Sequence, residues 1–335
     1  MIEDIKKRLR EYDIRLQEVS TNGIKLEFVN EYHKTYELCL AAVSNDGFAI
    51  KFVQEDLITP ELCLAAVRNN GHAIKFIRKD RRTPKIISAA INSYGDALQY
   101  VPRYLKTPEL CLLAVATTSH SLQYVPRYLK TPELCLLAVT IDGWSLEFVP
   151  EELKTMELCL EAMNNKTSSI QFVPKELQTY ELGLRAIRTH GFNIRYIRED
   201  LRTPELWLSA YEKSNEILKY LPKELQTYEM CLPAVYSSGD FIEYVREDLK
   251  THEMILFAVT NNGHALKFVP ENLQTPEICL KAIQNNPYSL AHVHVKILKE
   301  NPHIFMEAYK DIKSYAFKLV KDETIVKEIK ELMNL

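Results

Sequence analysis

The sequence predicts an all-α fold: an α-solenoid (superhelix) of about twelve 24-residue units, each a longer α-helix plus a short helical turn, with capping helices at both ends. The eighteen letters LQYVPRYLKTPELCLLAV at 98–115 recur unchanged at 122–139, an offset of 24 residues. Threonine keeps the same period, at Thr35, Thr59, Thr83, Thr107, Thr131, Thr155, Thr179, Thr203, Thr227, Thr251 and Thr275. An unbroken period of this size is typical of solenoids, whose units stack only on their neighbours.

The first half of each unit predicts an α-helix, as the unit from Thr131 to Lys154 shows. Thr131 can cap the helix, Pro132 fits its first turn, and Glu133 is favoured there by the helix dipole. Apolar residues then follow at helical spacing, namely Leu134, Cys135, Leu136, Ala138 and Val139. Gly143 is predicted to end the helix in a left-handed conformation. Eight of the nine glycines share its position in the unit.

The second half of the unit, SLEFVPEEL, predicts two short turns. Pro150 cannot continue an α-helix, and it also restricts the residue before it. We therefore expect one tight helical turn, for which the 3₁₀ form is an option, followed by a second turn through PEEL. Leu146, Phe148, Val149 and Leu153 are expected to point inward. Neither half can bury its apolar side alone, so neighbouring units must stack.

The chain divides into three parts on this basis. Residues 1–34 form an N-terminal cap and a degenerate first repeat, recognisable by Gly23. Residues 35–298 hold eleven tandem repeats. Residues 299–335 form an irregular last repeat and a C-terminal capping helix, with Pro302 where a unit would open. The capping helix places four apolar residues on one face: Ile325, Ile329, Leu332 and Met333.

The pattern T-P-E-L-C-L-x-A-V, followed by N-G-x-A-L-x-F-V-P-E-x-L, resembles a family of tandem helical repeats known only as a domain of unknown function. That family is typical of giant DNA viruses and some intracellular bacteria, and the resemblance covers roughly residues 11–300. It implies no catalytic residues. The period is also similar to that of leucine-rich-variant repeats, which adopt an α/3₁₀ superhelix. The iron–sulfur module attached to one such protein needs clustered cysteines, which this chain does not show.

Composition sets limits on the partners. The net charge of −3 predicts no overall attraction to nucleic acid or to an anionic membrane. No apolar run approaches the roughly 18 residues that a membrane helix requires, and the first residues lack the apolar stretch of a secretion signal. We therefore expect an intracellular, cytoplasmic protein, and the family resemblance implies a host cytoplasm if the protein is viral or a bacterial effector.

The sequence favours neither a metal, nor a cofactor, nor an enzyme. The seven cysteines share the fifth position of the unit: Cys39, Cys63, Cys111, Cys135, Cys159, Cys231 and Cys279. Neighbouring layers lie about 10 Å apart, too far for a disulfide or a common zinc ion, so we read them as small buried apolar residues. His292 and His294 are two residues apart and offer only weak support for a metal site. No catalytic motif is present.

Function is expected where the units differ. The alanine position never varies, whereas the position after the glycine and a position in the short helix vary freely. Such variation on a regular scaffold is typical of recognition surfaces, although a solvated face under no constraint is the alternative. The short helices are expected to line the concave face, where we predict a protein partner. The candidate residues from these positions are Lys75, Gln99, Gln123 and Trp144.

A basic stripe between residues 68 and 130 supports an alternative function. This segment has eleven basic and three acidic residues. Arg81 stands where nearly every other unit has leucine, and such a departure is a reasonable place to suspect function. The candidate residues of this stripe are Lys75, Arg78, Lys79, Arg81, Arg82, Arg103, Tyr104, Arg127 and Tyr128. They could hold an anion or a nucleic acid, dock an acidic partner, or simply be solvated.

Overall fold

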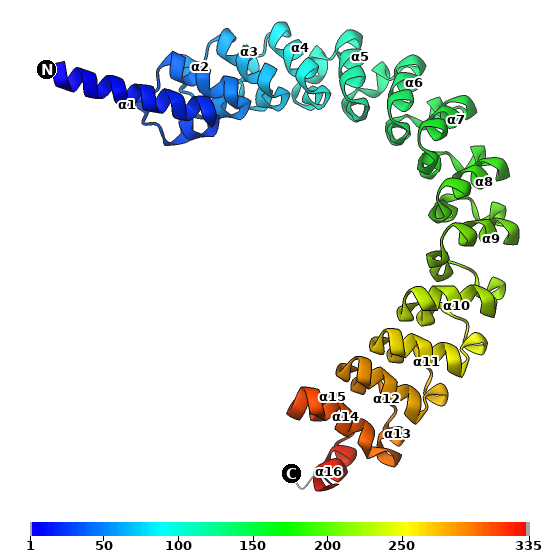
Figure 1. Ribbon diagram of the computed structural model, residues 1–335. Helices are drawn as coiled ribbons and strands as arrows, with labels where there is room; N and C mark the ends of the chain where they lie inside the picture. The colour runs from blue at the N-terminus through cyan, green and yellow to red at the C-terminus, as the bar shows by residue number, and fades with distance from the viewer. Residues whose placement is uncertain (1, 333–335) are drawn as a thin grey trace. The chain divides into compact units, whose positions relative to one another are not determined.

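A computed structural model of the chain describes residues 2–332, and these residues form α-helices and short 3₁₀-helices without any β-strand (Figure 1). The α-helices are α1 (Ile2–Thr21), α2 (Tyr36–Asn45), α3 (Pro60–Asn69), α4 (Pro84–Ser93), α5 (Pro108–Thr117), α6 (Pro132–Ile141), α7 (Met156–Asn165), α8 (Tyr180–Thr189), α9 (Pro204–Lys213), α10 (Tyr228–Ser237), α11 (His252–Asn261), α12 (Pro276–Asn285), α13 (Val295–Glu300), α14 (Pro302–Ile312), α15 (Ala316–Leu319) and α16 (Glu323–Leu332). The predicted all-α solenoid of repeated units is confirmed.

The 3₁₀-helices come in pairs after most α-helices, a longer one followed by a single turn. They are η1 (Gly23–Phe28), η2 (Glu31–His33), η3 (Gly47–Phe52), η4 (Glu55–Leu57), η5 (Gly71–Phe76), η6 (Lys79–Arg81), η7 (Gly95–Tyr100), η8 (Arg103–Leu105), η9 (Ser119–Tyr124), η10 (Arg127–Leu129), η11 (Gly143–Phe148), η12 (Glu151–Leu153), η13 (Thr167–Phe172), η14 (Lys175–Leu177), η15 (Gly191–Tyr196), η16 (Glu199–Leu201), η17 (Asn215–Lys219), η18 (Lys223–Leu225), η19 (Gly239–Tyr244), η20 (Glu247–Leu249), η21 (Gly263–Phe268), η22 (Glu271–Leu273), η23 (Pro287–His292) and η24 (Lys313–Tyr315). The expected 3₁₀ form of the short turns is therefore confirmed.

The chain separates into two compact units, an N-terminal unit of residues 1–179 and a C-terminal unit of residues 180–335. Within each unit, most repeats pack on the next through both the α-helix and the longer 3₁₀-helix, whereas the repeat of α9 contacts that of α10 through η17. The curvature that would make one face concave stays a prediction. No helix among the described residues is both long enough and apolar enough to span a membrane.

The threonine at the head of each repeat starts the α-helix as predicted. In α6, the Thr131 hydroxyl accepts a hydrogen bond from the backbone N–H of Leu134, 3.3 Å away, and Pro132 occupies the first turn. The helix then runs for ten residues, as do α2 to α12 throughout the repeats. The threonine cap and the proline together define where each helix begins. The start of each repeat is therefore determined by residues that are adjacent in the sequence.

The glycines do not end the helices in a left-handed conformation, so that prediction is wrong. None of them has a positive φ angle. Gly143 instead opens a 3₁₀-helix, and a Cβ atom placed on it would lie 2.2 Å from the carbonyl oxygen of Ala162 in the next repeat. The other glycines at this position approach the following alanine carbonyl in the same way, at 2.2–2.4 Å from an added Cβ. Close approach of two backbones, and not a special φ, therefore favours glycine at these eight positions, whereas Ser119, Thr167, Asn215 and Pro287 occupy the position in the other repeats.

Asparagine side chains join successive repeats at several layers. The Asn69 carboxamide oxygen accepts a hydrogen bond from the Gly47 N–H of the preceding repeat at 2.7 Å. Its amide group donates to the carbonyls of Ser44 and Asn45, at 2.9 and 3.1 Å. Asn45, Asn165 and Asn285 make equivalent bonds to Gly23, Gly143 and Gly263. These bonds satisfy backbone groups that the ends of the helices would otherwise leave open.

A second set of side chains, at the residue before each threonine, reaches forward by one repeat. Lys34 Nζ donates to the carbonyl oxygen of Phe52 at 2.8 Å, and Lys106 Nζ donates to that of Tyr124 at 2.8 Å. The same bond, always 18 residues ahead, is made by Arg82, Lys130, Lys154, Gln226, Lys250 and Gln274. We call these residues the connectors. They join each turn to the next 3₁₀-helix.

The core differs from the sequence prediction at three positions of the representative unit. Leu134, Cys135, Ala138 and Val139 are buried, together with Leu146 and Val149. Leu136, however, is exposed, and Phe148 and Leu153 are only half-buried. Layers stack along the array, so the side of the α-helix that faces away from the 3₁₀-helices has nothing to pack against.

The C-terminal end departs from the repeat. A six-residue α-helix, α13, replaces the usual single 3₁₀ turn, and Pro302 lies in the first turn of α14. Helix α16 contacts α13, and its residues Ile325 and Ile329 are buried, as the capping-helix prediction requires. Met333 lies outside the described residues.

The close approach of the backbones predicts the effect of Gly71→Ala. The new methyl group would lie 2.2 Å from the Ala90 oxygen and 3.0 Å from Tyr94 Cβ. Neither atom can move away without a shift of the backbone that carries it. We expect a loss of about 1–3 kcal/mol, measured by urea unfolding of the full chain. Gly183→Ala is the control, because its nearest neighbour is the flexible end of Ile197 at 3.1 Å. Equal effects of the two substitutions would contradict the prediction.

The asparagine bridge predicts the effect of Asn69→Ala. The substitution leaves the Gly47 N–H and two carbonyls without their partner. We expect a loss of about 1–3 kcal/mol and faster hydrogen exchange at the Gly47 amide. Arg68→Ala, at the exposed neighbouring position, should change neither quantity. Unaltered protection of the Gly47 amide in the Asn69 variant would show that the bridge contributes little.

Candidate binding surface

The longer 3₁₀-helices of the N-terminal unit present one continuous set of variable side chains. In a 3₁₀-helix, residues three apart lie above one another, so His72 and Lys75 share a face of η5. An aromatic residue follows directly after the second of these positions in each repeat. We call this surface the aromatic face, and it consists of Phe48, Lys51, Phe52, His72, Lys75, Phe76, Asp96, Gln99, Tyr100, His120, Gln123, Tyr124, Trp144, Glu147 and Phe148.

Ring contacts connect neighbouring layers of the aromatic face. Phe48 meets Phe76 of the next repeat edge to face, with the centroids 5.9 Å apart, and Lys75 Nζ lies 5.2 and 4.8 Å from these two rings. His72 contacts Tyr100 of the next repeat in the same way at 5.9 Å. These contacts help to orient Phe76 and Tyr100 on the face.

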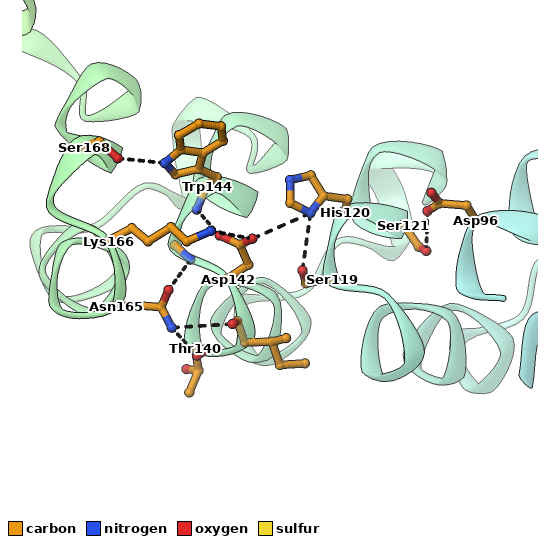
Figure 2. A network of polar contacts seen from close by, with 12 residues as sticks. Asp96, Ser119, His120, Ser121, Thr140, Asp142, Trp144, Asn165, Lys166 and Ser168 are labelled. Carbon is orange, nitrogen blue, oxygen red and sulfur yellow. Dashed lines mark hydrogen bonds and ion pairs between the residues drawn. The ribbon is translucent and has the colours of Figure 1, made fainter.

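Polar contacts dominate the part of the face around Trp144 (Figure 2). The Trp144 N–H of the backbone donates to Asp142 at 3.0 Å, and its indole Nε1–H donates to Ser168 Oγ at 2.8 Å. Lys166 forms a 3.0 Å ion pair with Asp142 and lies 5.3 Å from the indole ring. Burial acts to raise the pKa of Asp142, but the bonds from Trp144 and Lys166 outweigh it and lower the pKa. The indole is held in place with 44% of the residue exposed.

Ser119, His120 and Asp142 meet in the same region but do not form a catalytic triad. Ser119 Oγ lies 3.5 Å and Asp142 Oδ2 4.0 Å from one and the same ring nitrogen, Nδ1 of His120. A triad needs the serine and the carboxylate at opposite nitrogens of the imidazole, so that one nitrogen accepts the serine proton while the other donates its own hydrogen bond to the carboxylate. This arrangement cannot activate Ser119 in that way, and Ser119 is itself buried.

The structure places the predicted site residues on two separate surfaces. Lys75, Gln99, Gln123 and Trp144 lie on the aromatic face, where all four are exposed. The remaining candidates lie at the single-turn 3₁₀-helices η6, η8 and η10, or at the residue beside them, namely Arg78, Lys79, Arg81, Arg82, Arg103, Tyr104, Arg127 and Tyr128. Tyr104 and Tyr128 are 83% and 64% exposed, and the Arg103 guanidinium lies 5.3 Å from the Tyr128 ring.

Several of the basic side chains have partners within the protein. Arg78 pairs with Asp80 at 3.0 Å and with Glu55 at 3.3 Å, and Arg81 pairs with the same Glu55 at 3.2 Å. Arg81 also donates to the carbonyl oxygen of Ile58, which stands at a connector position without a donor of its own. Arg81 therefore links two repeats where the usual connector is missing.

Three further basic residues of the stripe serve as connectors. Arg82, Lys106 and Lys130 donate to backbone carbonyls of the next repeat, and burial lowers the pKa of all three. Arg127 pairs with Glu152 at 2.7 Å. Sequence reasoning counted these charges as available for a partner. The regular recurrence of a donor before each threonine was the signal that could have identified the connectors.

The α-helical side of the repeats carries a separate cleft of about 440 Å³ between α6 and α7. Its lining includes the exposed Leu136 and the carboxylates of Glu133, Glu152, Glu157 and Glu161. None of its lining residues belongs to the aromatic face, and Glu152 is already paired with Arg127. It supplies a useful reference surface for testing the aromatic face.

The cysteines are buried thiols with raised pKa values. Burial raises the pKa of Cys39, Cys135, Cys159 and Cys231 from 9.0 to about 11, and that of Cys279 to about 12. Their reading as small buried residues is confirmed. In the described part of the chain, no group of three or more His, Cys, Asp or Glu side chains could hold a metal ion.

These pKa values predict how the contribution of a cysteine varies with pH. The folded Cys135 thiol stays protonated up to about pH 11, whereas the unfolded thiol ionises from about pH 9. The advantage in unfolding free energy of the natural chain over Cys135→Ala is therefore complete below pH 9 and shrinks between pH 9 and 11. Urea unfolding of both chains across this range measures it, and an advantage that grows with pH would contradict the prediction.

Comparison with known proteins identifies a family. The family model described as "Domain of unknown function (DUF4116)" matches residues 36–82, 59–106, 107–154, 131–178, 155–202 and 252–313. The search of curated proteins finds no match. A solved chain described as "Computational Design of Self-Assembling Cyclic Protein Homooligomers" is 13% identical, with 97% of this chain and 91% of that chain covered, but its TM-score of 0.09 carries no argument. Because the family model covers more than half of the sequence in tandem, the chain belongs to the DUF4116 family of repeats.

Proposed function

We propose that this protein is a non-catalytic repeat scaffold that binds a protein partner through the aromatic face of its N-terminal unit. One observation carries the proposal: within each repeat, some positions are constant and others vary. The constant alanine, the glycine that faces it in eight repeats and the recurrent connectors join the repeats to one another. The variable position holds His72, Asp96, His120 and Trp144 in successive layers. Diversity presented on a constant scaffold is the usual arrangement of a recognition surface in repeat proteins.

The chemistry of the aromatic face suits a polypeptide. It combines aromatic rings, which are enriched at the centre of protein interfaces, with amides and charges of both signs, which are typical of the polar rim. Trp144 is the strongest candidate for an energetic anchor, because it is large, exposed and already held by Ser168 and Asp142. Little side-chain entropy remains to be lost when such a residue is buried by a partner.

The alternative function, binding of an anion or nucleic acid, has weaker support. Affinity for a polyanion depends on cations that can replace its counterions. Arg78, Arg81 and Arg127 are paired with carboxylates, and the connectors are directed to backbone carbonyls. Asp96 and Glu147 also lie on the aromatic face, where they would repel phosphates. These contacts favour a protein as the partner.

The proposal predicts that capture of a partner depends on the aromatic face. The immobilised chain is incubated with nuclease-treated cell lysate, and the bound proteins are quantified by mass spectrometry. We expect Lys75→Glu combined with Trp144→Ala to reduce capture of a defined protein by roughly ten-fold or more. The control, Lys85→Glu combined with Leu136→Ala, reverses one lysine charge and truncates one exposed apolar side chain on the α-helices, and it should retain capture. Circular dichroism verifies that both variants are folded.

Two results would overturn the proposal. Loss of the captured protein in the Lys85 and Leu136 control, with retention in the face variant, would place the interface on the α-helical side. Recovery of nucleic acid alone from untreated lysate, released by moderate salt and lost with Arg103→Glu, would support the anion-binding alternative instead.

A further inference from the structure

We infer that the segment bound by the aromatic face is a proline-rich stretch in the polyproline II conformation, with acidic residues at the end that lies over Lys51 and Lys75. This inference rests on the proposed function and names the chemistry of the partner. Two features of the N-terminal unit carry it, the row of aromatic rings and the order of the charges along the face, together with the general spacing of packed helix layers.

The spacing of the layers matches one turn of a polyproline II helix. Packed helix layers lie about 8–10 Å apart. A polyproline II helix has three residues per turn and rises about 3.1 Å per residue, so equivalent residues recur about every 9.3 Å. A β-strand repeats its side chains about every 6.6 Å and loses register with the layers. Every third residue of a polyproline II segment can therefore meet an equivalent site in successive repeats.

The amides on the face suit a backbone with open hydrogen-bonding groups. Gln99 and Gln123 are exposed at equivalent positions of consecutive layers, in the two repeats that contain the duplicated letters. A polyproline II backbone makes no internal hydrogen bonds, so its carbonyls can accept from these amides. An α-helical ligand would present a backbone that is already satisfied along its length.

The rings form a series of equivalent apolar steps. Phe76, Tyr100, Tyr124 and Phe148 occupy one position in four consecutive layers. Ring contacts support three of them: Phe48 meets Phe76, His72 meets Tyr100 and His120 meets Phe148, at 5.9, 5.9 and 5.7 Å between centroids. Rows of aromatic residues are the usual receptors for pyrrolidine rings, and a preformed row avoids the entropy cost of ordering.

The charges give the face a direction. Lys51 and Lys75 occupy equivalent positions in the first two repeats, Gln99 and Gln123 in the next two, and Glu147 in the fifth. Both lysines lie over aromatic rings at 4.5–5.2 Å, so their ammonium groups stay on the face. An acidic end of the ligand is favoured over the lysines and disfavoured beside Glu147.

Fluorescence anisotropy with synthetic peptides tests the inference on the full chain. The probe is a fluorescein-labelled peptide of about twelve residues, with proline at every third position and two glutamates at one end, made with the glutamates at either terminus. The comparison peptide has the same composition, but its prolines are placed two residues apart and therefore span a shorter stretch. We expect the first to bind roughly ten-fold more tightly than the second, the equivalent of about 1.4 kcal/mol.

Variants of the chain locate the peptide on the face. Trp144→Ala should weaken binding of the first peptide several-fold, and Lys51→Glu with Lys75→Glu should reverse the preference in favour of a peptide with lysines in place of the glutamates. Lys85→Glu is the matched control, because it makes the same change on the α-helical side, and it should leave the affinity unchanged.

The outcomes separate this inference from the proposed function. Equal binding of the two proline periods, or no binding of either peptide, contradicts the polyproline II ligand. The scaffold proposal then stands if capture from lysate still depends on Lys75 and Trp144, and both fail if it does not. Tighter binding of an oligothymidylate than of any peptide, sensitive to Lys75→Glu, would overturn both.

Discussion

The close approach of each glycine backbone to the alanine carbonyl of the following repeat is the constraint on which the rest of the structure depends. A Cβ atom on these glycines would lie 2.2–2.4 Å from that oxygen, a distance that no side chain can occupy. The contact holds one layer against the next, and it explains why glycine and alanine recur together along the chain. The asparagine bridges and the connectors can reach their partner carbonyls because the layers are this close.

A regular set of layers also determines what the surface can do. Since the backbone interactions are nearly the same in each repeat, a side chain at a given position always emerges on the same side, whatever its type. The chain can therefore place His72, Asp96, His120 and Trp144 in one row without disturbing the packing beneath them. Stability lies in the constant positions and specificity in the variable ones, which lets the two change independently.

Much of the fold could be predicted from the sequence because its causes are local. The threonine cap, the proline in the first turn and the restriction before Pro150 each act within a few residues. The errors arose where the partner lies a repeat away. Gly143 was predicted to end a helix because the residues next to it in sequence do not reveal its close contact with the Ala162 carbonyl of the next repeat. Lys106 and Lys130 were counted as surface charge for the same reason, since their acceptors lie 18 residues ahead. The aromatic face was predicted only in part, because Phe148 was assigned to the core.

The connectors and bridges span fixed offsets, such as 18 residues from Lys106 to Tyr124 and 22 residues from Gly47 to Asn69. Insertion of a whole 24-residue unit recreates every one of these bonds, whereas a shorter or longer insertion breaks those that cross it. The gene can therefore lengthen by recombination between identical copies, in steps of one unit, without passing through a misfolded intermediate. The identical stretches at 98–115 and 122–139 are what a duplication of one unit would produce. Each such duplication would extend the row of variable side chains by one position.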